Sequence, residues 1–151
     1  MKKLVYQEGL FNCKWLSKFI NCWFFNGEKS KIENLLYSSI LFLNVFLNIN
    51  GLLILFEALE NLKPWIGLKI YRSAKQLNRA QPVILTAKRQ YRKAVYWLVK
   101  SIQIRKESNF KARMVNEIKG IVFGSITNSL RKKKNYYNYA VLCKTASKFK
   151  W

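Results

Sequence analysis

Residues 80–100, AQPVILTAKRQYRKAVYWLVK, combine two patterns of secondary structure. Residues 81–86 form a short strand-like run, and from Lys88 onward apolar positions recur at helical spacing. The predicted helix therefore begins with cations at positions 88, 89, 92 and 93, although a helix N-terminus favours negative charge. A bound phosphate would be attracted both by these cations and by the free backbone N–H groups of the first turn.

A second strand-like run, about residues 65–72, precedes this stretch and follows Lys63-Pro64, where the helical pattern ends. Between the two runs, the residues are mainly polar and basic. We therefore predict a β-hairpin with a basic tip. Pro82 fits such a hairpin because proline is tolerated in edge strands, and both strands of an isolated hairpin are edges.

Three helices are predicted before the hairpin. The first spans about residues 10–25, and Asn26-Gly27 is a stop signal for it. The second spans about 30–47, with Ser30 as a capping candidate, and is apolar nearly all round, which is typical of a central core helix. A loop signal at Asn48-Ile49-Asn50-Gly51 separates it from the third helix, about 51–62.

A membrane span is the alternative for part of this region. Asn34–Phe56 contains 23 residues without a charge, which is long enough to cross a bilayer. Asn44, Asn48 and the Asn50-Gly51 pair argue against a continuous span, so we favour a buried core. The N-terminus has neither the pattern of a secretory signal peptide nor that of an Arg- and Ser-rich transit peptide.

Three further helices follow the hairpin, at about 88–106, 109–123 and from Leu130 onward. Asn109 is a cap candidate, and GSITNS interrupts the pattern before the last helix, which starts with the cations 131–134. We predict a mainly α fold: one helical-bundle domain, 1–151, of about six helices, with a protruding basic β-hairpin between the third and fourth. Its parts are an apolar helical core (1–62), the hairpin (63–87), and basic helices with a tail (88–151).

The charge is concentrated after residue 62. The chain has 28 Lys and Arg against 7 Asp and Glu, a net charge of +21. Residues 1–62 hold six basic and five acidic residues, whereas residues 63–151 hold 22 basic and two acidic ones. Such an imbalance opposes compaction unless an anionic partner, either nucleic acid or an acidic membrane surface, neutralises it.

Catalysis and metal binding find little support in the composition. The chain lacks histidine, the commonest general base and metal ligand. Cys13, Cys22 and Cys143 have no zinc spacing and are expected to be reduced. No Walker, dinucleotide or G-x-S-x-G motif is present. We expect no enzyme activity, no cofactor and no metal; an enzyme acting on RNA would have only Glu107 and Glu117 in its basic part.

RNA is favoured over DNA as the partner. The sequence has no zinc-finger, basic-zipper or RNP1 signature, so recognition of RNA shape and phosphates fits better than base reading. Aromatic residues near the charge can stack on unpaired bases, but packing is the commoner role for each of them. These residues are Tyr71, Tyr91, Tyr136, Tyr137, Tyr139 and Trp151.

The order of these segments resembles the universal small-subunit ribosomal protein seven family. The similar stretches are KFINCWFFNGEKSKIENLLYSS (18–39), FEALENLKP (56–64), QPVILTAKRQYRKAVYWLV (81–99), ARMVNEI (112–118) and the terminal KFKW. Together they span about residues 11–151, and their order and spacing are more specific than any one of them.

The resemblance implies a structural constituent of the small ribosomal subunit. Such a protein binds the 3′ major domain of small-subunit rRNA and nucleates assembly of the head, with its hairpin near the E site and the mRNA exit. The implied partners are rRNA, neighbouring head and platform proteins, mRNA and E-site tRNA, without DNA or a membrane span. The alternative is a membrane-anchored protein with a basic tail that binds RNA or lipid.

The resemblance also assigns the RNA-binding residues, position by position. They are Lys29, Lys31, Lys69, Arg72, Lys75, Arg79, Lys88, Arg89, Arg92, Lys93, Arg113, Arg131, Lys132, Lys133, Lys134, Lys148, Lys150 and Trp151.

The chain departs from the family pattern at several positions. Glu28 stands where the family has a basic residue, and Ser73-Ala74-Lys75 replaces a Gly-Gly pair at the hairpin tip. The basic N-terminal arm is reduced to Lys2 and Lys3. The abundance of Lys, Asn, Ile, Leu and Phe is typical of an organelle-encoded ribosomal protein, mitochondrial more than plastid, although an A+T-rich bacterium gives a similar composition. We therefore expect the mitochondrial ribosome as its location.

Overall fold

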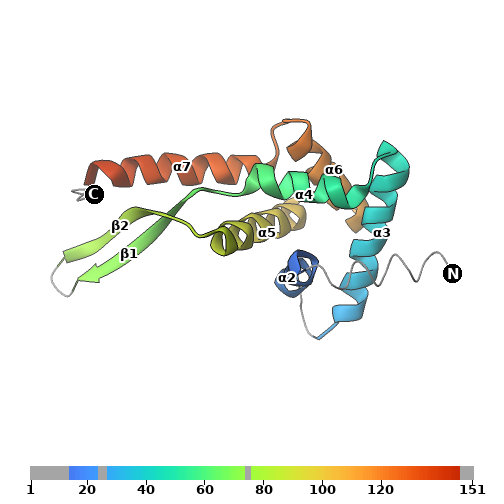
Figure 1. The fold of residues 1–151 in the computed structure, drawn as a ribbon, viewed down its shortest axis with the longest axis horizontal. Coiled ribbons are helices and arrows are strands. Elements are labelled where there is room, and N and C mark those ends of the chain that lie inside the picture. Colours follow the sequence, from blue (N-terminus) through green and yellow to red (C-terminus); the bar gives the residue numbers. More distant parts are fainter. Residues whose placement is uncertain (1–13, 24–26, 74–75, 147–151) are drawn as a thin grey trace.

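The computed structural model describes residues 14–23, 27–73 and 76–146, and for residues 14, 71–73, 76–79 and 144–146 it describes the backbone alone. Within these residues, helices form a bundle from which a β-hairpin projects (Figure 1). This is the predicted mainly α fold, with the hairpin between the third and fourth described helices. The elements are α2 (Lys14–Trp23), α3 (Lys29–Leu47), α4 (Gly51–Leu62), β1 (Ile66–Ser73), β2 (Gln76–Ile84), α5 (Ala87–Ile104), α6 (Phe110–Val122) and α7 (Asn128–Ala146).

The predicted break between α3 and α4 is confirmed. Asn48 ends α3 in the left-handed conformation, with φ of 51°, and the Asn50 side chain accepts a hydrogen bond from the Leu52 N–H at 3.1 Å. The Asn44 side chain accepts a hydrogen bond from the Gly51 N–H across the turn. A Cβ at position 51 would lie 2.6 Å from the Ile40 carbonyl oxygen, so glycine permits the close approach of the two helices.

The core lies between α2, α3, α4, α5 and α6, and α5 contributes one complete face to it. The helix α5 contacts α2, α4, α6 and α7. Its inner face consists of Ala94, Val95, Leu98, Val99 and Ile102, all buried. This is the apolar stripe that the helical spacing after Lys88 predicts.

The helix α3 differs from the prediction of a central, fully buried helix. It lies at the end of the molecule away from the hairpin, and only one side of it packs inward (Figure 1). Its other side leaves Val45 79% and Phe46 58% exposed. The bundle therefore buries only part of the apolar surface of α3. Apolar residues on all sides of the helix did not show how much of it is buried.

No single helix in the described part of the chain is long and apolar enough to span a membrane. The helices α3 and α4 pass that test only as a pair, and they are bent by 100° at the break between them.

The hairpin consists of two antiparallel strands whose register pairs Ile66 with Ile84 and Tyr71 with Arg79. The second strand begins at Gln76 rather than at about residue 81, so its prediction was wrong at that end. Residues 76–79, of which only Leu77 is apolar, gave a loop-like pattern, but the strands of a lone hairpin can be polar because neither needs a buried face. Pro82 pairs opposite Leu68, as an edge strand allows.

Two tyrosines from α7 hold the base of the hairpin. The Tyr137 hydroxyl accepts a hydrogen bond from the Trp65 N–H at 2.9 Å, and the Tyr136 hydroxyl accepts one from the Leu68 N–H at 2.8 Å. The Tyr136 ring also packs edge-on against Trp97 of α5, with 5.3 Å between centroids. These contacts fix the angle between the hairpin and the bundle, and in Figure 1 α7 runs beside the strands.

Replacing Tyr136 by phenylalanine is expected to lower the free energy of unfolding by about 1 kcal/mol, because the Leu68 N–H loses its acceptor while the ring stays in place. Urea unfolding would measure this change. Tyr139, which is 54% exposed on the same helix, provides the control, and its phenylalanine variant should leave stability unaltered. Equal effects of the two variants would contradict this role for the Tyr136 hydroxyl.

An ionic cluster joins α6 to the start of α7. Glu117 is fully buried; its carboxylate pairs with the Arg105 guanidinium at 2.6 Å and accepts a hydrogen bond from the Ser129 N–H at 3.0 Å. The Ser129 hydroxyl donates to the same carboxylate. Glu117 thus neutralises the half-buried Arg105 and accepts a hydrogen bond from the first turn of α7, which favours negative charge.

Arg105 also binds Glu107, at 2.9 Å. Hydrogen bonding from the Arg105 guanidinium lowers the pKa of Glu107 to about 2, from an ordinary value of 4.5. A carboxyl group whose pKa is lower in the folded state stabilises the fold above its unfolded pKa and loses that contribution as the pH falls. Part of the stability should therefore disappear between about pH 4.5 and pH 2. Urea unfolding across this range should show a weaker pH dependence in Glu107→Gln; an unchanged profile would contradict the assignment.

Candidate nucleic-acid interface

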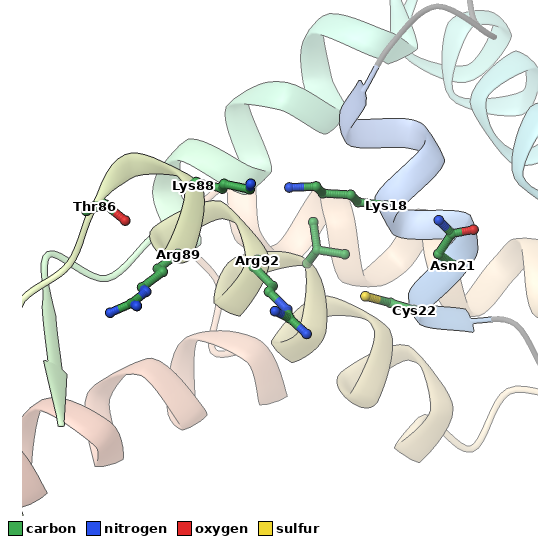
Figure 2. A pocket seen from close by; sticks show the side chains of 8 residues that line it. Lys18, Asn21, Cys22, Thr86, Lys88, Arg89 and Arg92 are labelled. Atoms are coloured by element: carbon green, nitrogen blue, oxygen red, sulfur yellow. The ribbon is translucent and has the colours of Figure 1, made fainter. Parts of the chain in front are cut away.

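A basic groove lies between α2 and the first turns of α5. It has a volume of about 630 Å³ and is lined by Lys18, Asn21, Cys22, Thr86, Lys88, Arg89, Arg92 and Val95. Figure 2 shows Lys18 from α2 and Lys88 from α5 extending toward each other across it. Four of its eight lining residues are cations and none is an acid. The groove therefore has the charge expected of a site for an anion.

An aromatic contact holds α2 against α5 beside this groove. The ring centroids of Trp15 and Tyr91 lie 4.3 Å apart, and the Lys18 ammonium lies 5.0 Å from the Trp15 centroid. Tyr91 is one of the aromatic residues considered for base stacking, but this half-buried ring takes part in helix packing.

Among the described residues, no acid pairs with the positive charge at the start of α5. Thr86 is the N-cap residue, yet its side chain makes no capping hydrogen bond, and the first turn contains no acid. Lys88, Arg89 and Arg92 are exposed, and within the described residues they form no ion pair. Both the helix N-terminus and the three side chains are thus available to an anion.

Lys93 is placed differently from the three cations before it. It is half-buried, its ammonium lies 4.1 Å from the Tyr136 ring centroid, and it donates a hydrogen bond to the Tyr136 hydroxyl. Lys93 therefore joins α5 to α7, and it does not line the groove.

The predicted cations of α7 divide into two kinds. Arg131 and Lys134 are exposed, whereas Lys132 and Lys133 are half-buried and burial lowers the pKa of each. The Lys133 ammonium donates a hydrogen bond to the Asn61 carbonyl at 2.6 Å and so ties α7 to the end of α4. The run of four cations is therefore not a uniform exposed patch.

The remaining predicted residues lie apart from the groove or outside the described part. Lys29 and Lys31 are exposed at the start of α3, but each pairs with an acid, Glu33 at 3.6 Å and Glu28 at 2.6 Å respectively. Lys69 is exposed on β1, and Arg113 is half-buried on α6 with its Nε atom buried and without a hydrogen bond. The side chains of Arg72 and Arg79, and all of Lys75, Lys148, Lys150 and Trp151, lie outside the described residues.

The prediction missed Lys18 and Asn21 as members of the groove. The sequence places Lys18 on the polar side of the first helix, but only the packing of α2 on α5 brings it to Lys88. The tyrosines 136 and 137 could be interpreted as stacking or as packing residues, and their hydroxyl groups bind the hairpin backbone.

Comparison with known proteins gives one family. The model of the family described as "Ribosomal protein S7p/S5e" matches residues 1–141. The chain is 30% identical over 144 residues to a small ribosomal subunit protein uS7 of Sulfurimonas denitrificans, covering 95% of this chain and 92% of that protein. It is 31% identical over 114 residues to the protein uS7m of Reclinomonas americana, with coverages of 76% and 71%. A uS7 protein of Blochmanniella floridana is 27% identical over 152 residues, with coverages of 100% and 96%.

Proposed function

The chain belongs to the ribosomal protein S7p/S5e family, and from this we propose that it binds small-subunit rRNA through the groove between α2 and α5. Its role is that of a structural constituent of the small ribosomal subunit. The observation that carries the RNA-binding site is the convergence of Lys18, Lys88, Arg89 and Arg92 from two helices on one groove without an acid.

The groove is suited to a turn of phosphate backbone. Arginine guanidinium groups form paired hydrogen bonds to phosphate oxygens, and lysines add positive charge without directional demand. The free N–H groups at the start of α5 offer further donors to the same anion. None of these contacts reads a base, so the groove fixes the position of the chain on folded RNA.

The family likeness supports a more detailed role. We propose that the chain binds the 3′ major domain and helps to nucleate the head, and that Lys69, Arg72, Lys75 and Arg79 bring the hairpin to RNA near the E site and the mRNA exit. Arg131 and Lys134 are exposed on α7, which packs beside the hairpin, and we propose that they contact RNA phosphates as well. The further partners are neighbouring head and platform proteins.

We also propose a mitochondrial ribosome as the location. The composition supports it, as does the likeness to a uS7m protein at 31% identity. A bacterial uS7 protein is about as similar, at 30% identity, so identity alone does not distinguish the two settings.

Sedimentation tests this function. Mitochondria from the source organism would be lysed with detergent and run on a magnesium-containing sucrose gradient, with and without ribonuclease. The chain is expected in the small-subunit fractions and should leave them after ribonuclease. Recovery in light micellar fractions, indifferent to ribonuclease, would instead favour membrane association of α3 and α4.

A further inference from the structure

Trp65 stands out at the base of the hairpin because it is large, aromatic and exposed. It immediately precedes β1, and 64% of its surface is exposed. Tryptophan is usually well covered in folded proteins. The indole does not line the basic groove.

The backbone of Trp65 is held from two sides. Its N–H donates to the Tyr137 hydroxyl at 2.9 Å, and its carbonyl accepts from the Leu85 N–H at 3.0 Å. Neither bond involves the indole, which is thus presented to solvent from a fixed point. Ordering such a side chain on a ligand costs little conformational entropy compared with a long flexible one.

The position of Trp65 also connects it to the basic groove. Leu85, its backbone partner, directly precedes the groove residue Thr86. The Lys63 ammonium lies 5.7 Å from the Trp65 centroid and 5.3 Å from that of Tyr91 in α5. Lys63 also pairs with Glu60, so it is Leu85 and Tyr91 that link this position to the groove. The exposed indole therefore stands at the junction of groove and hairpin, beside one paired lysine.

We propose that Trp65 is a stacking platform for an unpaired nucleobase of the RNA bound in the groove. An exposed indole offers a large π-face, and unstacked bases of single-stranded loops and bulges bind such faces. A base is favoured over an apolar protein surface because Leu85, which bonds to the Trp65 backbone, leads directly into the basic groove at Thr86. Trp65 then makes the site selective for an unpaired nucleotide next to the phosphates, and the inference rests on the proposed binding of rRNA.

The test uses the full-length chain and an in vitro transcript of small-subunit rRNA from the same organism. Trp65→Ala should weaken binding by roughly 5- to 150-fold, the range for loss of one base–aromatic stack. In dimethyl sulfate probing, one or two unpaired nucleotides should lose protection while those protected by the groove keep theirs. Trp65→Phe, which retains an aromatic face, should restore most of the affinity and the protection.

Phe46→Ala is the matched control. Phe46 is also an exposed aromatic residue, at 58%, and it has a lysine at its ring, with the Lys119 ammonium 3.1 Å from the centroid. It lies on α3, away from the hairpin, so its replacement should change neither affinity nor protection. Circular dichroism would verify that both alanine variants keep the helical content of the wild type.

The outcomes separate the stacking role from the proposed function. If Trp65→Ala binds as tightly as wild type, with the same protected nucleotides, while charge reversal in the groove weakens binding, the stacking inference is wrong and the groove is right. An equal loss in Phe46→Ala would overturn it too. A wild-type chain that does not bind the transcript would refute the proposed function and, with it, this inference.

Discussion

Replacing Arg89 and Arg92 together by glutamate is expected to weaken binding of the chain to small-subunit rRNA by at least about 100-fold. Each arginine in the groove can supply a charge-assisted hydrogen bond of about 1.5–3 kcal/mol to phosphate, and both would be lost. The dependence of log affinity on log salt concentration should fall by about one for each contact removed. Incorporation into the subunit should fail as a result, and filter binding with gradient sedimentation would measure both effects.

The same change should not harm the fold. A glutamate introduced at position 89 stands three residues after the N-cap Thr86, which is the spacing of a capping box. Negative charge in the first turn also matches the helix dipole. The double variant is therefore expected to be at least as stable as the wild type while its affinity for RNA falls. This combination would show that the binding site is lost and the fold is kept.

Lys100→Glu together with Lys106→Glu is the matched control. Both lysines are exposed, one in α5 and one just after it, and neither lines the groove, while the change in net charge is the same. This variant should retain most of the affinity. If it weakens binding as much as the arginine pair, total charge rather than the groove would account for binding.

Replacing Glu117 by alanine is expected to lower the free energy of unfolding by about 3–5 kcal/mol, the largest loss among the described ion pairs. The change removes the fully buried member of the pair and leaves Arg105, which is 23% exposed, with Glu107. Removal of one member of a buried pair costs up to about this much. It also removes the acceptor of the buried Ser129 N–H and hydroxyl groups, so the start of α7 loses its anchor on α6. Urea unfolding followed by circular dichroism would measure the loss.

Glu107→Ala provides the comparison, because this carboxylate binds the same arginine but is 32% exposed. A partly exposed pair contributes up to about 1 kcal/mol, so the loss should be much smaller. Comparable losses in the two variants would mean that the burial of Glu117 does not increase its contribution to the free energy of unfolding.

Local signals predicted most of the helical architecture. The turn at Asn48–Gly51, the cap at Asn109 and the apolar stripe of α5 depend on neighbouring residues, and each lies where the sequence pattern predicts it. The hairpin was predicted with its first strand nearly in place, and its second strand was wrong at the start because residues 76–79 lack an apolar alternation.

The candidate site was predicted in part, since its assembly depends on long-range packing. The sequence directly predicts the cations at the start of α5. Lys18 lines the same groove as Lys88 only because α2 packs on α5. The engagement of Lys93 by Tyr136 joins residues 43 positions apart, which no periodic pattern contains. The exposure of Trp65 likewise depends on how the hairpin leaves the bundle.

The cations at the start of α5 make salt act on the free chain and on its RNA complex in opposite ways. In the free chain, added ions screen repulsion among unpaired positive charges and so favour the fold. In the complex, the same ions compete for the phosphates and favour dissociation. High ionic strength is therefore expected to preserve the purified protein and to weaken its assembly, so reconstitution should be favoured by a transfer from high to lower salt in the presence of RNA.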